Sequence, residues 1–339
     1  MVYSEAMKIV SRNFEIPLVS VPAYTYNSAK TVIETLESIK AQTYPNIELI
    51  ISDDCSTDDT VDLCRNWIEK NKARFVRTEI IVPEHNTGIS ANCNRGEAVC
   101  AGEWIKGIAG DDLLMPNCIQ DCMDYVAEHP ETVALFGRVR SFGGTEEENK
   151  AMDDKFDYYL LSWTKEQLLH RLIFEGNGLP APGFFYHRSL LDKKYIVSDE
   201  RIPMLEDLPK WINLLRAGVQ FHFLDKDIVQ YRLSSGVSTG KRSSLKYFES
   251  ERLYKFYYAY PEWLKIDLEE AVKRIVKEEC DVYKQLLEAE SDDANVIHKQ
   301  RDEYQKLYER YYREYNQIVG SKAYKLGKML LKPLKWLKR

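Results

Sequence analysis

Several features that define other classes of protein are missing from this sequence. Its first residues hold no long apolar stretch of the kind that forms a signal peptide. Nowhere does the chain contain the roughly 18 consecutive apolar residues that a membrane-spanning helix needs. Its 7 cysteines are scattered, without the C-x₂-C spacing of zinc sites. We therefore expect a cytoplasmic protein with reduced thiols, and we exclude a secreted disulfide scaffold and a membrane channel.

An excess of basic residues is missing as well. The 339 residues include 47 Lys and Arg against 53 Asp and Glu, which gives a net charge of −6 and argues against a nucleic-acid partner. The charge is uneven, because residues 321–339 contain six Lys, one Arg and no acid. Lysines and leucines alternate there at helical spacing as far as Pro333 and beyond it, which predicts a basic amphipathic segment. Such a segment binds the anionic surface of a membrane peripherally; the alternative is a solvated tail.

Short β-rich runs alternate with helical patterns between residues 16 and 140. This alternation predicts βαβ units and a mostly parallel sheet flanked by helices, with ligands beyond the carboxyl ends of the strands. Apolar spacing places strands at 16–21, 47–52, 79–82, 104–109 and 132–139. Apolar residues at helical spacing predict intervening helices at about 28–39, 61–68, 89–101 and 118–126.

The remainder of the chain has a different texture. Residues 141–240 are less regular and include the turn-rich GNGLPAPGFF at 176–185. After residue 245 the pattern is helical, and aromatic and aliphatic residues recur at near-heptad spacing from 304 to 318. That helix either packs on the body of the protein or forms a coiled-coil contact in a homo-oligomer. We therefore expect four segments: an N-terminal extension at 1–15, a catalytic domain at 16–240, a helical extension at 241–320 and the basic tail at 321–339.

Three pairs of acidic residues stand where a ligand site is expected. Asp53 and Asp54 end the strand at 47–52, where a carboxylate can accept hydrogen bonds from a base or a ribose. The acids Asp58 and Asp59, which follow shortly after, are better explained as caps of the next helix. Within the first pair, Asp54 is the candidate for ligand contact.

The other two acid pairs each allow two interpretations. Asp111 and Asp112 follow Gly110 at the end of a strand, where they either hold a hard divalent cation or cap a helix. Glu206 and Asp207 precede a helix, where they either complement the helix macrodipole or include a general base. Taken singly, neither pair is specific.

The order of these motifs is far more specific than any one of them. VSVPAYTYN, SIKAQTYPNIELIISDDCSTDDT, NTGISANCNRGEAVCAGEWI, GDDLLMP and LEDLPKWINLLRAG follow one another in a way that resembles the family 2 glycosyltransferases, over about residues 16–240. The resemblance implies the α/β GT-A fold, here followed by a C-terminal helical extension. It assigns nucleotide binding to Tyr24, Tyr26, Asp54, Asn94 and Asp111, a divalent metal (Mn²⁺ or Mg²⁺) to Asp111 and Asp112, and catalysis to Glu206 and Asp207, with Asp207 as the base.

The sequence also departs from the family pattern. Ala109 stands where an acid is common, Cys93-Asn94 replaces an Arg-Asn pair, and Ser234 replaces a His that often contacts metal or diphosphate. Arg232 and Lys241, with Arg242 beside the latter, are candidates to supply that charge to the diphosphate. Candidates for the acceptor pocket, which come from the turn-rich region and its surroundings, are Trp163, Asn177, Phe184 and Phe185.

The implied function is metal-dependent transfer of a sugar, with inversion, from a nucleotide sugar to a hydroxyl of a glycan or lipid-linked glycan. UDP is the nucleotide expected, surface polysaccharide assembly the expected process, and the cytoplasmic face of the membrane the expected place. The alternative is a non-catalytic scaffold that keeps the fold and has lost turnover. A nucleotidyltransferase and a dinucleotide dehydrogenase are disfavoured, because VPAYTYNSAK lacks their Gly-rich loops.

Overall fold

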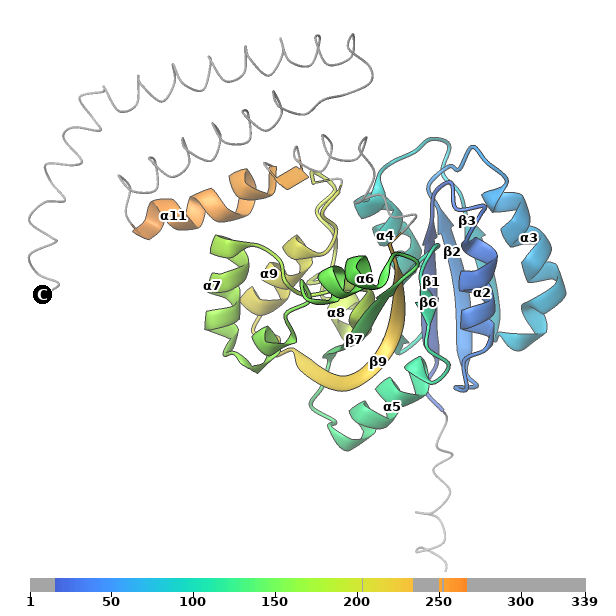
Figure 1. Ribbon diagram of the computed structural model, residues 1–339, viewed down its shortest axis with the longest axis horizontal. Coiled ribbons are helices and arrows are strands. Elements are labelled where there is room, and N and C mark those ends of the chain that lie inside the picture. Colours follow the sequence, from blue (N-terminus) through green and yellow to red (C-terminus); the bar gives the residue numbers. More distant parts are fainter. Residues whose placement is uncertain (1–15, 203, 234–249, 252, 267–339) are drawn as a thin grey trace, which may run out of the picture. The chain divides into compact units, whose positions relative to one another are not determined.

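The computed structural model describes residues 16–266 except 203, 234–249 and 252 (Figure 1). The chain divides into two compact units, Met1–Tyr254 and Lys255–Arg339. The boundary expected at residue 240 falls within the first unit. Lys241, the near-heptad pattern and the basic tail lie outside the described residues.

The first half of the sheet is built from parallel strands with helical crossovers. Strand β1 pairs with β2 on one side and with the short strands β4 and β5 on the other, and β2 pairs with β3, all in parallel. Helices α2 and α3 cover one face of these strands and α4 covers the opposite face (Figure 1). The bounds are β1 Val19–Thr25, α2 Val32–Lys40, β2 Ile47–Asp53, α3 Thr60–Asn71, β3 Arg77–Ile81, α4 Ile89–Ala98, β4 Trp104–Ile105 and β5 Ile108–Ala109.

The second half of the sheet mixes directions. β8 runs antiparallel to both β4 and β7, β9 runs parallel to β7, and β6 pairs antiparallel with β9 at the edge. The resulting strand order is β3-β2-β1-β4-β8-β7-β9-β6. The bounds are β6 Leu113–Leu114, α5 Cys118–Glu128, β7 Ala134–Phe142, α6 Glu146–Asp153, α7 Lys165–Glu175, β8 Phe184–His187, α8 Ser189–Asp192, α9 Leu208–Arg216 and β9 His222–Arg232.

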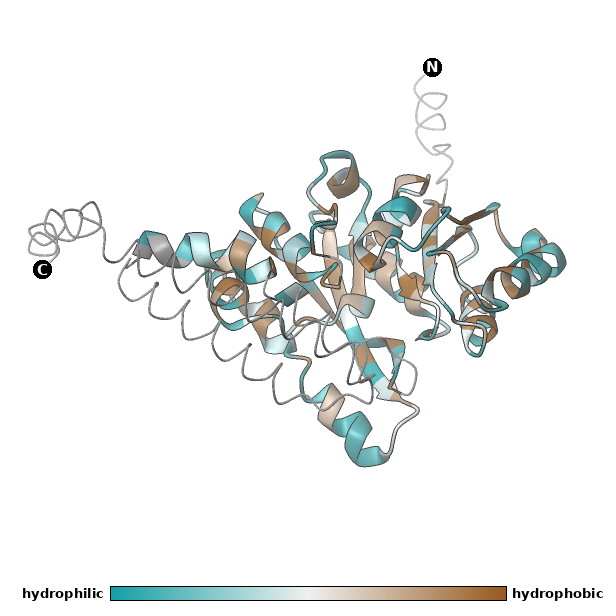
Figure 2. Cartoon of the chain, turned by 90° about the horizontal axis from the view of Figure 1, so that it is seen from above, coloured by the Kyte–Doolittle hydropathy of each residue, from teal (hydrophilic) through white to brown (hydrophobic). Residues whose placement is uncertain are grey.

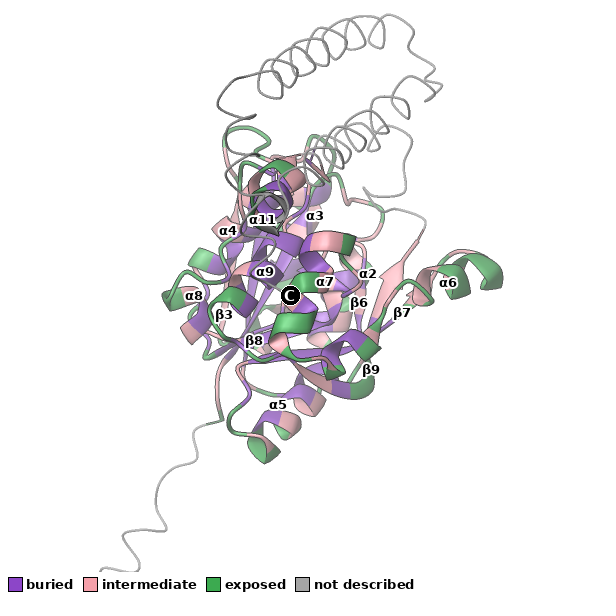
Figure 3. Cartoon of the chain, turned by 90° about the vertical axis from the view of Figure 1, so that its left-hand side faces the viewer, coloured by how far each residue is buried: buried purple, intermediate pink, exposed green. Residues whose placement is uncertain are grey.

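Burial of the strands explains why these residues form the sheet. All residues of β2 are buried, as expected for a parallel strand with helices on both faces. Figure 2 shows the strands mainly hydrophobic and the surrounding helices mixed, and Figure 3 shows burial concentrated in the same strands. Helix α6 has no buried residue and is held at its start by a capping box from Thr145 to Glu148. A second, aromatic cluster of Phe136, Phe184, Trp211 and Phe221 packs β7 and β8 against α9.

The predicted mostly parallel α/β sheet is confirmed, with two local differences. The strand expected at 16–21 begins at Val19, because Pro17 has no N–H and Ile16 is exposed. The strand expected at 104–109 is split into β4 and β5. At the break the buried Lys106 ammonium donates to the carbonyl oxygens of Gly107 (2.9 Å) and Pro182 (2.5 Å).

The described part of the second unit is short. A π-helical turn at Lys255–Ala259 continues into α11, Tyr260–Ile266. Across the residues that the structure describes, no helix combines the length and the apolar character needed to span a bilayer.

Candidate active site

The ends of β1, β2 and β5 bring two of the three acid pairs to one edge of the sheet. Asp54 N donates to Thr25 O at the end of β1 (2.9 Å), and Gly110 N donates to Tyr24 O (2.8 Å). The loops that carry Asp54 and Asp111 therefore both start beside the last two residues of β1. This is the edge at which ligands bind in open parallel sheets.

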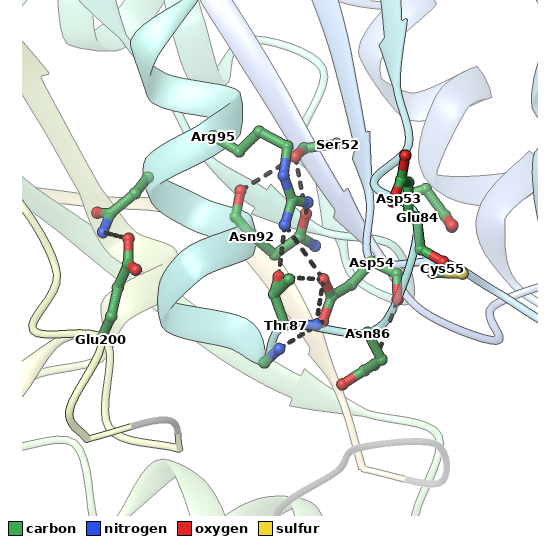
Figure 4. A network of polar contacts seen from close by, with 12 residues as sticks. Ser52, Asp53, Asp54, Cys55, Glu84, Asn86, Thr87, Asn92, Arg95 and Glu200 are labelled. Atoms are coloured by element: carbon green, nitrogen blue, oxygen red, sulfur yellow. Dashed lines mark hydrogen bonds and ion pairs between the residues drawn. The ribbon is translucent and has the colours of Figure 1, made fainter.

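Asp54 is buried and holds the start of helix α4. Its carboxylate accepts hydrogen bonds from Thr87 N (3.0 and 3.1 Å), Thr87 Oγ1 (2.6 Å) and Gly88 N (2.7 Å), and it pairs with Arg95 (3.3 Å). Figure 4 shows the Asp54 carboxylate directed at this loop, with Arg95 closing it from the helix. Gly88 has φ +89°, which favours glycine at this turn. Groups of the protein itself thus supply the hydrogen-bond partners of Asp54, the residue that the sequence proposed as a contact of the nucleobase.

The neighbouring acids stabilise the loop after β2. Asp53 accepts from Thr25 Oγ1 (2.7 Å), Ser56 N (2.7 Å) and Ser56 Oγ (2.6 Å). Asp58 accepts from Thr60 N (3.0 Å) near the start of α3, as expected for a capping residue. Asp59, at the N-cap position, makes no side-chain capping bond.

Asp112 combines deep burial with an incomplete set of partners. Its Oδ1 accepts from Arg232 N (2.9 Å), whereas its buried Oδ2 has no hydrogen-bond partner among the described residues. Loss of hydration, together with the adjacent Asp111 charge, raises the pKa of Asp112 well above its ordinary value. The half-buried Asp111 lies beside it.

Arg232 fixes this acid pair from strand β9. Its Nε donates to Asp111 O (2.8 Å), its guanidinium pairs with Glu34 of α2 (2.6 Å), and it lies 4.5 Å from the centre of the Phe142 ring. The candidate for diphosphate binding is therefore a structural partner of the acid pair here. Sequence reasoning missed Glu34, because nothing local marks a surface acid of α2 as its partner.

The acid pair fits a divalent cation with few protein ligands. Among the described residues, Asp112 Oδ2 is a buried acceptor without a hydrogen-bond donor, and hard cations such as Mg²⁺ prefer one or two carboxylates together with phosphate oxygens. Within the described residues there is no group of three or more His, Cys, Asp or Glu side chains that could hold a metal.

Asp207 occupies the N-cap of α9 with an oriented carboxylate. Its Oδ1 accepts from Leu208 N (2.6 Å) and its Oδ2 from Asn177 Nδ2 (2.6 Å). Burial raises the pKa of Asp207, and burial followed by the Asp207 charge raises the pKa of Glu206 to about 7. Asn177, a candidate for the acceptor pocket, thus contacts the candidate base directly.

A buried charged pair that sequence reasoning missed lies behind this helix start. Lys210 of α9 and Glu97 of α4 form an ion pair of 2.8 Å, and Tyr24 Oη donates to the same Glu97 oxygen (3.3 Å). The Tyr24 ring lies between Gly96 and Gly107, where an added Cβ would come within 3.0 Å of it. The signal in the sequence was a lysine three residues after Asp207, beside the apolar residues of α9.

The other candidates are placed as follows. Tyr26 is exposed at the carboxyl edge. Asn94 exchanges hydrogen bonds with the backbone of Ser198 and bonds Glu200, so it ties α4 to a later loop. Trp163 is half-buried and meets the exposed Tyr159 ring edge to face, whereas Phe184 is buried in the aromatic cluster.

Comparison with known proteins gives one consistent family. The model of "Glycosyl transferase family 2" matches residues 20–195. The chain is 25% identical over 250 residues to the putative teichuronic acid biosynthesis glycosyltransferase TuaG of Bacillus subtilis, covering 70% of this chain and 90% of that protein. It is 32% identical over 118 residues to the glycosyltransferase GlyG of Streptococcus pneumoniae, covering 35% of this chain and only 38% of GlyG.

Solved structures agree on the fold. TarS of S. aureus in complex with UDP-GlcNAc superposes with a TM-score of 0.56 at 20% identity, over 77% of this chain and 71% of that one. A mannosyltransferase from Pyrobaculum calidifontis, in complex with GDP-Man and Mn²⁺, gives a TM-score of 0.51 at 16% identity, over 97% and 93% of the chains. The chain therefore has the GT-A fold, and it is a glycosyltransferase that belongs to family 2.

Proposed function

We propose that the protein transfers a sugar, with inversion and with the help of a divalent metal, from a UDP-sugar to a hydroxyl of a glycan or lipid-linked glycan. The observation that carries this proposal is the Asp207 carboxylate, held by two N–H donors at the start of α9. Two solved relatives support a nucleotide-sugar donor, since one holds UDP-GlcNAc and the other holds GDP-Man with Mn²⁺.

Asp207 acts as the general base in this proposal. Asn177 and the Leu208 N–H fix its carboxylate, so that its free lone pairs accept the proton of an acceptor hydroxyl. A carboxylate with a raised pKa is a stronger base than one in water, and a base is most effective when its pKa lies near the working pH. As the proton leaves, the acceptor oxygen attacks the anomeric carbon and the nucleotide diphosphate departs from the opposite face.

Asp111 and Asp112 are the residues that would hold the metal. A divalent cation supplies Lewis acidity that offsets negative charge on the departing diphosphate. The protein prepares this edge by fixing Asp112 Oδ1 with the Arg232 backbone N–H and by leaving Oδ2 unsatisfied. Arg232 contributes through this positioning, because its guanidinium already pairs with Glu34.

Nucleotide recognition combines direct and indirect roles. Tyr26 is exposed at the carboxyl edge of β1 and is available to contact the nucleobase of the donor. Asp54 acts indirectly, since it orders the Thr87–Gly88 turn at the start of α4. Asn94 is proposed to act in the same way, through the loop at Ser198.

The cellular setting is proposed from relatives and from charge. TuaG is named for teichuronic acid biosynthesis, which supports a role in surface polysaccharide assembly. The basic segment at 321–339 supports peripheral binding at the cytoplasmic face of the membrane, close to a lipid-linked acceptor. The heptad-like pattern at 304–318 supports a homo-oligomer through the C-terminal helices.

Replacement of Asp207 by asparagine tests the proposal. Release of the nucleoside diphosphate, UDP or GDP, is measured from UDP-N-acetylglucosamine, UDP-glucose, UDP-galactose and GDP-mannose, each with and without Mn²⁺, and nucleotide binding is measured by thermal shift. We expect release from a UDP-sugar only with Mn²⁺, and its loss in Asp207→Asn with UDP binding retained. Asp192→Asn, an exposed acid on α8, is the control. Undiminished release by Asp207→Asn, or equal loss of binding and turnover, would contradict the assignment of the base.

A further inference from the structure

Lys210 and Glu97 form a charged pair within the core. Lys210 is 6% exposed and Glu97 is 3% exposed, and their atoms meet at 2.8 Å between α9 and α4. A buried ion pair is weak evidence for stability, because desolvation of both charges offsets their attraction. Holding two helices together is therefore not enough to explain this ion pair.

Its position along α9 supplies that account. Asp207 is the N-cap of α9 and Lys210 is the third residue of the helix, two positions whose side chains lie close together at a helix start. An opposite charge within about 4–6 Å stabilises the ionised form of a carboxylate. The Lys210 charge accordingly lowers the pKa values of Glu206 and Asp207, against the larger effect of burial.

The groups that face Lys210 from the other elements hold its charge in place. Glu97 and the buried Cys93 thiol face it from α4, and Tyr24 from β1 donates to the same Glu97 oxygen. Tyr186 of β8 also lies near Glu97. Burial and the Glu97 charge raise the pKa values of both tyrosines, so Glu97 and Lys210 are the charged members of the group.

We propose that Lys210, anchored by Glu97, is a positioning residue that favours the ionised form of Asp207, so that Asp207 can accept the proton of the acceptor. The proposal rests on the proposed role of Asp207 as base. Glu97 alone would disfavour ionisation of Glu206, and Lys210 opposes that effect. Desolvation of the two charges destabilises the core, and in return the pair provides an ionised base at its edge.

The test is the pH dependence of UDP release in the presence of Mn²⁺. It uses whichever of UDP-N-acetylglucosamine, UDP-glucose and UDP-galactose the wild-type enzyme hydrolyses fastest. In Lys210→Met we expect the acidic limb of kcat/KM to move up by about one pH unit, hence about tenfold less activity below the limb and recovery at higher pH. Lys210→Arg keeps the charge and should keep the limb. Arg216→Met, which removes an exposed charge from the last turn of α9, is the control.

A double variant separates chemistry from folding. Glu97→Leu with Lys210→Met replaces the ion pair by apolar side chains, a change that is often neutral or stabilising, so this variant should fold. Because it removes the Glu97 charge together with the Lys210 charge, its acidic limb should lie between those of the wild type and Lys210→Met. An acidic limb at the wild-type position in Lys210→Met, or an equal loss of activity at every pH in that variant, would overturn the proposal. Asp207→Asn tests the role of Asp207 as base separately. If Asp207→Asn is inactive while the acidic limb does not move in the Lys210 variants, the proposed role of Lys210 is refuted and that of Asp207 stands.

Discussion

Replacing Asp54 with asparagine separates two roles that the sequence alone could not tell apart. In the structure one carboxylate oxygen accepts from Gly88 N at 2.7 Å and the other from Thr87 Oγ1 at 2.6 Å, while Arg95 neutralises the charge. Asparagine keeps one acceptor oxygen, but its NH₂ group takes the place of the other and faces an N–H donor. Arg95 also loses its carboxylate partner. Since hydrogen bonds to charged groups contribute about 1.5–3 kcal/mol and an unpaired buried charge costs more, we expect a loss of about 2–4 kcal/mol in unfolding free energy.

The measurement is made without any ligand. For a unit of this size the expected loss lowers Tm by roughly 5–12 °C, which circular dichroism would follow. Hydrogen exchange should accelerate at the amides of Thr87 and Gly88, where α4 begins. Asp62→Asn, an exposed acid of α3 paired only with Arg65 along its own helix, should leave Tm unchanged within error. If Asp54→Asn melted like the wild type and lost only nucleotide affinity, Asp54 would be a ligand contact and our structural account would be refuted.

Three further predictions follow from other parts of the chain. Burial and the Asp207 charge raise the folded-state pKa of Glu206 to about 7, so the folded protein binds this proton more tightly than the unfolded chain does. The proton stabilises the fold fully below about pH 4.5, and this stabilisation is lost as the pH rises through 7. Glu206→Gln should flatten that decline in urea unfolding at several pH values, and an unchanged slope would contradict the shift. A Cβ on Gly137 would lie 2.4, 2.6 and 3.1 Å from Ile228 Cδ1, Cγ1 and Cγ2, so Gly137→Ala should destabilise by about 1–3 kcal/mol. The loss should be smaller in an Ile228→Ala background, which lacks these three atoms; additive losses in urea unfolding would contradict the packing. Removal of residues 321–339 should move the protein from pellet to supernatant when it is sedimented with phosphatidylglycerol liposomes, and equal sedimentation would rule out the membrane role of the tail.

The parts of the fold that the sequence predicted are those with local signals. Strand β2 is a continuous apolar run, and α2 buries Val32, Leu36 and Ile39 at helical spacing, so both could be found from periodicity. The second half of the sheet could not, because β8 and β9 obtain their partners from distant segments and β9 carries a register shift against β7. A bulge of this kind interrupts the alternation on which strand prediction depends.

The same distinction applies to the site. The sequence placed Asp54 and Asp112 just after strands and Asp207 at the start of a helix, and the structure has all three at these positions. The sequence did not show that Asp54 faces the backbone N–H groups of Thr87 and Gly88, since main-chain donors carry no residue type to recognise. Nor could it pair Lys210 with Glu97, which are 113 residues apart and meet only when α9 packs against α4.

The pairing of β6 with β9 has a consequence for how the enzyme is made. Leu113 and Leu114 pair with Gln230 and Val229, and Asp112 receives the N–H of Arg232 from 120 residues downstream. During synthesis the first strands and helices emerge long before this partner exists. A nascent chain that has not yet delivered β9 therefore leaves the edge that carries Asp111 and Asp112 unfinished. Catalytic competence would arrive as one of the last events of translation of this domain, so that incomplete products released early would not consume the cell's activated sugars.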